Sequence, residues 1–164
     1  METFRHSLLE IEKIVNRGVE VVCCSLLVGI TVLIFVQIIF RYLLQNSISW
    51  SEELARYMMI WTVFLAAGYV LSKGAHANID MLINRFSPTM RMVLEKGSLL
   101  LIMAFAVIMI RYGLMLMRFG SRQISSALGV PMGYVYLAIP IGGVLLLFYC
   151  LALMYRPKEG CGAL

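Results

Sequence analysis

The chain has few charged residues for its length. Asp, Glu, Lys and Arg make up 14% of its 164 residues, whereas apolar residues make up 61%. A soluble globular domain carries about 25% charged residues and about half apolar ones. The polar surface is therefore too small to cover a globule in water, and the sequence predicts an integral membrane protein. By length we expect a single membrane domain over residues 1–164.

Histidine and cysteine are scarce, and their positions argue against redox and metal chemistry. The two histidines, His6 and His76, are expected near a membrane surface, whereas haem ligands would have to lie within the spans. The four cysteines include no CxxC pair, and we interpret them as small, reduced hydrophobic residues. Their expected position on the inner side does not suit periplasmic disulfide exchange. We expect no enzymatic activity, no cofactor and no metal site.

No acidic residue lies near the middle of a long apolar segment. A small proton-coupled exporter usually needs such an acid to couple a proton to its cargo. The deepest charge is Arg111, and a cation does not accept a proton. The sequence also lacks the paired broken helices that build a substrate site at the membrane midplane. A stand-alone four-helix proton-coupled exporter is kept as the alternative to a supporting role in a larger assembly.

Long apolar runs dominate the rest of the chain. A membrane core of about 30 Å is crossed by about 20 helical residues, and four segments are long enough, at about residues 19–40, 54–71, 96–117 and 130–155. The first exceeds the apolar core of a signal peptide and lacks a cleavage site, so we expect it to remain as a span. The predicted fold is all-α with four transmembrane helices. Ala66–Gly68 should let another helix approach closely, and Pro140 should bend the last span because proline lacks a backbone donor.

Two further segments are amphipathic and are expected at the membrane surface. Over residues 3–18, apolar residues recur at spacings of three and four, with charged residues such as Glu12 between them. This pattern is typical of an interfacial helix or one that lies against a partner, and equally of a cytosolic lead-in to the first span. Residues 76–86 are predicted to form a short interfacial helix. Pro88 suits the first turn of the next helix.

Basic residues indicate which side of the membrane each loop faces. They are more numerous before the first span, between the second and third, and after the fourth. Because cytoplasmic loops carry the excess of Lys and Arg, both termini are predicted to face inward. The net charge of +5 follows this flanking pattern, so nucleic acid is not expected as a partner. The outer side still holds five arginines: Arg41, Arg56, Arg111, Arg118 and Arg122.

The second span begins with an unusual group of charged residues, in the stretch SISWSEELARYMMIWTVF. Ser49 and Glu52 fit a capping box, and Trp50 is of the type that anchors a helix at the membrane surface. Glu52 and Glu53 precede Arg56 by four and three residues, the spacings at which helical side chains pair. The sequence thus predicts a capped helix start that carries paired charges.

We predict that these charges join a cluster at the outer face. Arg41 follows the first span and Arg111 lies about two turns before the end of the third, so both should reach the height of Glu52, Glu53 and Arg56. A charge at the bilayer centre costs about 2.5–3.5 kcal/mol, and less near the interface. The arginines are therefore expected to pair or to snorkel. Two interpretations stay open: a network that holds helices together, and a face that meets another protein.

Three stretches, taken in order, resemble a known family. The first is FRYLLQNSISWSEELARYMMIWTVFLAAGYVL at residues 40–71, which is similar to an arginine followed by W-x-E-E and W-x-x-F. The second is KGAHANIDMLINRFSP at residues 73–88, and the third is SSALGVPMGYVYLAIPIGG at residues 125–143. Together they resemble the small membrane subunit, of the DctQ type, of tripartite ATP-independent periplasmic (TRAP) transporters.

The resemblance implies a non-enzymatic subunit of a sodium-driven transporter for an organic acid, such as a C4-dicarboxylate or a sialic acid. In such systems a periplasmic protein captures the acid, and a larger, separate membrane subunit moves it inward. The small subunit is implied to pack against the large one as a scaffold in the bacterial inner membrane. It is also implied to help dock the periplasmic binding protein.

His76 and Asp80 lie one turn apart in the predicted helix 76–86. Two such residues are too few for a metal site, which usually has more protein ligands. A local hydrogen bond or cap that fixes the loop after the second span is the first interpretation. Contact with the partner subunit is the second, and proton coupling through His76 is the third.

Overall fold

The computed structural model of the chain describes residues 2–43, 45, 49–83 and 88–155. These residues form the helices α1 (Glu2–Leu43), α2 (Ser49–Ile83), α3 (Pro88–Gly120), α4 (Gly133–Tyr136) and α5 (Ala138–Tyr155). Four stretches within them are long and apolar enough to cross a membrane: Glu10–Leu43, Ser49–Lys73, Lys96–Gly120 and Gly133–Leu153. The prediction of an all-α fold with four candidate spans is confirmed, and the inward orientation of both termini stays a prediction.

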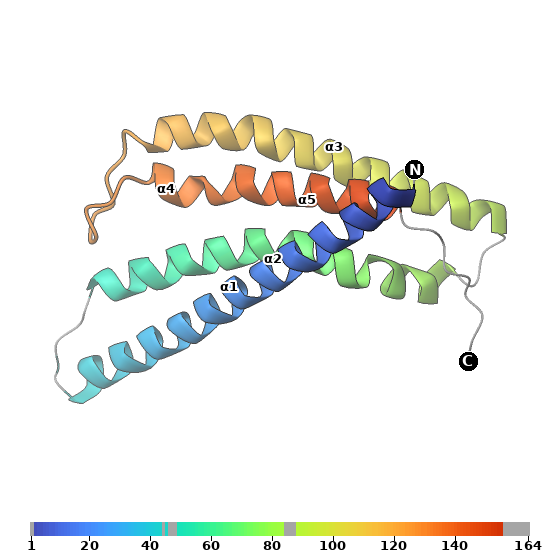
Figure 1. Cartoon of the computed structure of the whole chain (residues 1–164). Coiled ribbons are helices and arrows are strands. Elements are labelled where there is room, and N and C mark those ends of the chain that lie inside the picture. The colour runs from blue at the N-terminus through green and yellow to red at the C-terminus, as the bar shows by residue number, and fades with distance from the viewer. Residues whose placement is uncertain (1, 44, 46–48, 84–87, 156–164) are drawn as a thin grey trace.

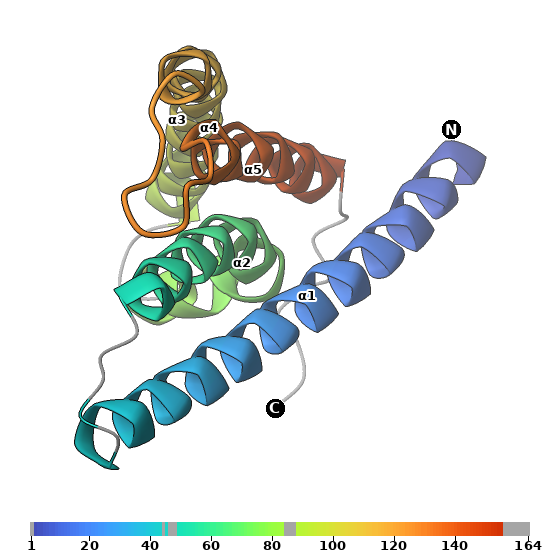
Figure 2. The same cartoon turned by 90° about the vertical axis from the view of Figure 1, so that its left-hand side faces the viewer.

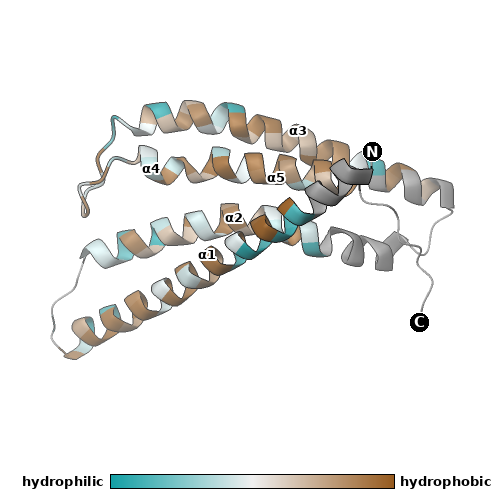
Figure 3. Ribbon diagram, in the orientation of Figure 1, coloured by the Kyte–Doolittle hydropathy of each residue, from teal (hydrophilic) through white to brown (hydrophobic). Residues whose placement is uncertain are grey.

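The helices are arranged so that α5 lies between α3 and α2 (Figures 1 and 2). α1 packs mainly on α2, which it crosses obliquely, and makes a smaller contact with α5. None of the most apolar stretch of α1 is buried within the chain, whereas 50% of the corresponding stretch of the last span is buried. Figure 3 shows hydrophobic residues along the middle of the bundle and polar residues mostly toward the helix ends.

Close contact between α2 and α5 depends on glycine. A Cβ atom added at Gly142 would lie 2.8 Å from the carbonyl oxygen of Phe64, and one added at Gly68 would lie 2.9 Å from Tyr149 Cδ2. Small residues at a crossing let two helix backbones pack together in lipid, as expected for the stretch that contains Gly68. The core around this crossing is formed by Leu71, Ala106, Met109, Leu146, Tyr149, Cys150 and Leu153.

The described helices are longer than the segments that the sequence predicts. The amphipathic segment 3–18 and the first span form the single helix α1, and the predicted helix 76–86 begins within α2. The sequence offers only Gly18 and Gly74 as breaks in these two regions. A glycine inside a helix costs only about 1 kcal/mol, whereas a proline costs about 3 kcal/mol. Without a proline, each helix continues past the expected boundary.

The last span is divided near its start. α4 ends at Tyr136 and α5 begins at Ala138, so that Leu137 lies between the two helices. In a continuous helix the carbonyl group of Tyr136 would accept a hydrogen bond from residue 140, and Pro140 has no N–H to donate. The interruption lies directly after this carbonyl group. A bend at Pro140 itself stays a prediction.

Candidate functional site

The loop between α3 and α4 folds back on itself at one end of the bundle. This is the end where α1 stops, α2 starts at Ser49 and α3 stops at Gly120 (Figure 1), and we call it the Ser49 end. The Met132 amide donates to the carbonyl oxygen of Gln123 at 2.9 Å, and the Ser125 amide donates to that of Val130 at 3.0 Å. Gly129 closes the tip with a φ of 67°, a conformation that glycine adopts at low cost.

Glu53 fastens this loop to α2. Its Oε2 accepts hydrogen bonds from the backbone amides of Ala127 at 3.0 Å and Leu128 at 3.1 Å. Its Oε1 accepts a hydrogen bond from the Tyr57 hydroxyl group, whose oxygen also lies 3.1 Å from Met132 Sδ. A carboxylate that accepts hydrogen bonds forms stronger ones than a neutral oxygen does. One side chain of α2 therefore holds a loop more than 70 residues further along the chain.

Glu52, the neighbouring acid, makes a different connection. Its Oε1 accepts a hydrogen bond from Gln37 Nε2 of α1 at 2.8 Å. Residues 52 and 53 are separated by about 100° around a helix with 3.6 residues per turn, so their side chains leave α2 in different directions. Glu52 joins α2 to α1, and Glu53 joins α2 to the loop before α4.

The predicted ion pairs are not part of this arrangement. Among the residues that the structure describes, no salt bridge joins Glu52 or Glu53 to Arg41, Arg56 or Arg111. The carboxylates instead accept hydrogen bonds from the Gln37 side-chain amide, the Tyr57 hydroxyl group and two backbone amides, and all three arginines are exposed. Trp50 is 46% exposed at the same end. The contact of these residues with a partner protein stays a prediction.

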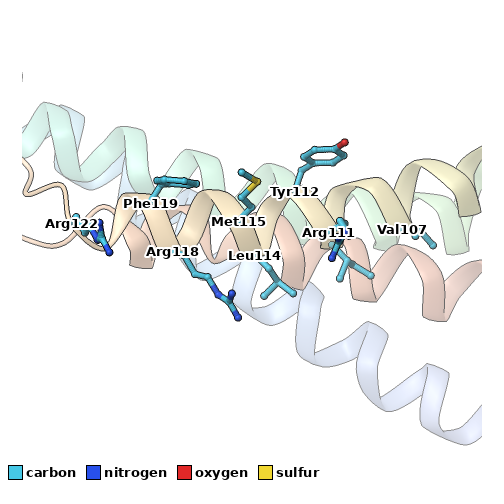
Figure 4. Close-up of a pocket in the computed structure, with 9 residues that line it drawn as sticks. Val107, Arg111, Tyr112, Leu114, Met115, Arg118, Phe119 and Arg122 are labelled. Carbon is cyan, nitrogen blue, oxygen red and sulfur yellow. The ribbon is translucent and has the colours of Figure 1, made fainter.

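Arg111 shares a shallow cavity of about 760 Å³ with two other arginines, Arg118 and Arg122. In Figure 4, Arg111, Leu114 and Arg118 extend to one side of α3, whereas Tyr112, Met115 and Phe119 extend to the other. A second, almost wholly apolar groove of about 440 Å³ lies between α3 and α5. The two cavities share Tyr112, Met115 and Phe119 in their walls.

A buried polar junction, which the sequence did not reveal, joins α1, α2 and α5 away from the Ser49 end. The Ser72 hydroxyl oxygen lies 3.1 Å from Asn16 Oδ1, and Glu12 is only 2% exposed. Tyr149 of α5, which is fully buried, contributes its ring to the core beside them. The spacing of these residues could have indicated the junction. Glu12, Asn16 and the buried Val19 are four and three residues apart, so they share one face of α1.

His76 and Asp80 lie within α2, about one turn apart. Their side chains are outside the part of the chain that the structure describes, so the three interpretations of this pair stay predictions. In the described part, no group of three or more His, Cys, Asp and Glu side chains could hold a metal ion. Cys23, Cys24 and Cys150 are free thiols there.

These features define an all-helical, multi-pass membrane protein with an ordered loop at one end. The family model described as "Tripartite ATP-independent periplasmic transporters, DctQ component" matches residues 30–159. This match covers most of the chain, and the chain belongs to that family of small permease subunits of bacterial TRAP transporters. The resemblance found from the motifs is confirmed, and so is the prediction that the protein is not an enzyme.

Several relatives extend the comparison. The chain is 28% identical to "C4-dicarboxylate TRAP transporter small permease protein DctQ" of Rhodobacter capsulatus, over 83% of this chain and 74% of the relative. It is 24% identical to "Sialic acid TRAP transporter small permease protein SiaQ" of Vibrio cholerae, over 84% of this chain and 80% of the relative. It is also 24% identical to "Sialic acid TRAP transporter permease protein SiaT" of Haemophilus influenzae, over 83% of this chain but 22% of the relative. There the matched segment is part of a much longer permease chain.

Proposed function

We propose that this chain is a scaffold subunit that packs against the large membrane subunit of a sodium-driven organic acid transporter in the bacterial inner membrane. Membership of the DctQ family is the observation that carries this proposal, because the family is one component of a tripartite system. The relatives named for C4-dicarboxylate and sialic acid support an organic acid as the cargo. Transport itself is assigned to the partner.

The exposed face of α1 suits a lasting contact within the membrane. Large apolar side chains cover it, with Val28 and Phe35 each 64% exposed. Among the described helices, α1 packs mainly on α2 and, to a smaller extent, on α5. In lipid, helices associate through close packing because burial from water supplies no driving force there. A long, regular helix at the edge of the bundle offers a second subunit a continuous surface for such packing.

The Ser49 end is proposed to face the periplasm and to contribute to docking the substrate-binding protein. Glu53 holds the loop in one conformation, which lowers the entropy that binding would otherwise cost. Ile124, at 73% exposure, and the exposed Arg122 project from this ordered loop. Arg41, Trp50 and Arg56 lie at the same end and would extend the contact surface.

Co-purification tests the scaffold proposal most directly. We would tag this chain, extract it gently from its native membrane and identify the proteins that come with it. We expect a larger polytopic membrane protein in about a one-to-one ratio, as the tripartite family implies. A folded chain that purifies alone, and that moves an organic acid or a drug across liposomes by itself, would instead support the four-helix exporter.

A further inference from the structure

Three arginines gather at the Gly120 end of α3. Arg111 and Arg118 are seven residues apart, so both lie on one face of α3, and Arg122, in the turn just after the helix, lines the same cavity. All three are exposed, and the packing face of α3 is elsewhere, at Ala106, Met109 and Gly113. Within the described residues none of the three forms a salt bridge with a carboxylate. They form a positive surface that no carboxylate of the described residues pairs with.

Arg118 and Arg122 lie near the expected border between lipid headgroups and acyl chains, and Arg111 lies deeper. The candidate span ends at Gly120, so Arg118 lies at the end of the span and Arg122 lies beyond it. Arg111 is nine residues before that end, about 13 Å deeper at a rise of about 1.5 Å per residue. A long arginine side chain at that depth extends its guanidinium group toward the surface while its stem stays in apolar surroundings. The three charges can thus converge near the headgroup level.

An apolar groove adjoins this positive surface. It runs between α3 and α5, where its walls include Ile108, Leu116 and Ile139. Tyr112, Met115 and Phe119 line both the groove and the cavity with the arginines. A free phosphate ion would use only the charged part, and an acidic protein surface would not need the apolar part. A molecule with an anionic head and a hydrocarbon tail matches both.

We propose that the Gly120 end of α3 binds one anionic phospholipid. Arg118 and Arg111 hold the phosphate, because a guanidinium group can donate two parallel hydrogen bonds to its oxygens. Arg122 adds positive charge at the headgroup, and one acyl chain lies in the groove between α3 and α5. In the proposed topology this lipid belongs to the outer leaflet, but binding itself depends neither on the topology nor on the proposed transport function.

Native mass spectrometry of the full-length chain tests this site. The chain would be purified in mild detergent, exposed to equal amounts of phosphatidylglycerol and phosphatidylcholine, and examined for retained lipid. We expect one phosphatidylglycerol per chain in preference to phosphatidylcholine. Arg118→Gln, and more so Arg111→Gln with Arg118→Gln, should weaken that retention roughly tenfold or more, since each loses a charge-assisted hydrogen bond. Arg118→Lys should retain part of it.

Arg41→Gln is the matched control, because Arg41 is an exposed arginine in the last turn of α1 at the same end of the bundle. It should retain phosphatidylglycerol as the unaltered chain does. Equal retention by all variants would overturn the proposal. So would complete displacement of the lipid by millimolar glycerol phosphate, which lacks acyl chains and would identify a plain phosphate site. If Arg118→Gln retained the lipid but no longer co-purified with a membrane protein, the arginines would form a protein interface instead, and the proposal would be wrong.

Discussion

At the scale of single residues, Glu53 determines how the Ser49 end is organised. Its two carboxylate oxygens accept hydrogen bonds from α2 itself, through Tyr57, and from the amides of Ala127 and Leu128. Backbone amides cannot turn away as side chains can, so the loop is held at a fixed position relative to α2. The adjacent Glu52 has no contact of this kind with the loop and bonds to Gln37.

Replacing Glu53 should loosen the loop selectively. In Glu53→Ala the Ala127 amide loses the carboxylate acceptor, and the Leu128 amide keeps only Ser125 Oγ, at 3.2 Å. A hydrogen bond to a charged group contributes about 1.5–3 kcal/mol. We therefore expect hydrogen exchange in a peptide covering residues 123–132 to accelerate at least roughly tenfold. If the loop docks the binding protein, organic acid uptake should also fall while the large subunit still co-purifies.

Glu52→Ala provides the control for this measurement. It removes an acid of the same size from the preceding position, but its lost contact is with Gln37 on α1. Exchange in the 123–132 peptide should then stay close to that of the unaltered chain. An unchanged loop in Glu53→Ala would contradict the role given to this carboxylate, and unchanged uptake would remove the docking function of the loop.

The sequence predicted the positions of Glu52, Glu53 and Arg56 at the start of the second span but not their partners. Helical spacing relates residues three and four apart, and it therefore suggested pairing with Arg56. The actual partners of Glu53 lie 74 and 75 residues away, and such distant contacts leave no periodic signal. Glu12 was missed for a similar reason, because its burial depends on α2 and α5 rather than on its neighbours in α1.

At the scale of helices, hydropathy was sufficient to locate the four candidate spans, and the helix ends were harder to place. Pro88 correctly marked the start of α3, because proline suits the first turn of a helix. Gly18 and Gly74 did not stop α1 and α2, because neither position carries a residue that forbids helix. A change from apolar to polar residues marks where a span leaves the membrane. The helix itself can continue past that point, because its end depends on backbone hydrogen bonds rather than on hydropathy.

Adding a methyl group at Gly142 should weaken the packing of α2 on α5. In Gly142→Ala the new Cβ would lie 2.8 Å from the carbonyl oxygen of Phe64, a backbone atom that can move only with its helix. Overpacking of this kind costs about 1–3 kcal/mol. We expect a lower midpoint of thermal unfolding in detergent, measured by circular dichroism or by loss of monodisperse protein.

Gly97→Ala is the matched substitution in α3. Nothing lies within 4 Å of a Cβ placed at Gly97, and alanine favours helix over glycine by about 1 kcal/mol. This variant should be as stable as the unaltered chain or slightly more so. Equal destabilisation by the two substitutions would show that the α2–α5 contact is looser than the structure describes.

At the scale of the whole molecule, the chain has one edge helix and one structured end. α1 exposes most of its apolar length, and the Ser49 end carries the ordered loop together with five exposed arginines. A lateral partner and a partner outside the membrane would thus meet different parts of the chain. This division agrees with a subunit of a three-component system, in which one partner is in the membrane and another is periplasmic.

The orientation of the molecule can be tested with single cysteines in a chain whose four native cysteines are replaced by serine. Ile124→Cys in the loop and Lys13→Cys near the start of α1 place thiols at opposite ends of the molecule. Ile124 is 73% exposed, and the Lys13 side chain is 79% exposed. Because basic residues favour the cytoplasm, a membrane-impermeant maleimide should label position 124 in intact spheroplasts. Position 13 should react only after permeabilisation. The reverse pattern would place both termini outside.

The way in which Glu52 and Glu53 are bonded also determines how the Ser49 end responds to ionic strength. At about 1 M salt the Debye length is only about 3 Å, so attractions between exposed charges are largely lost. The acids are held by an amide side chain, backbone amides and a hydroxyl group, none of which carries a net charge. Concentrated salt should therefore release what the exposed arginines attract and leave the loop in place. The same end of the molecule thus joins a salt-resistant framework to a salt-sensitive surface.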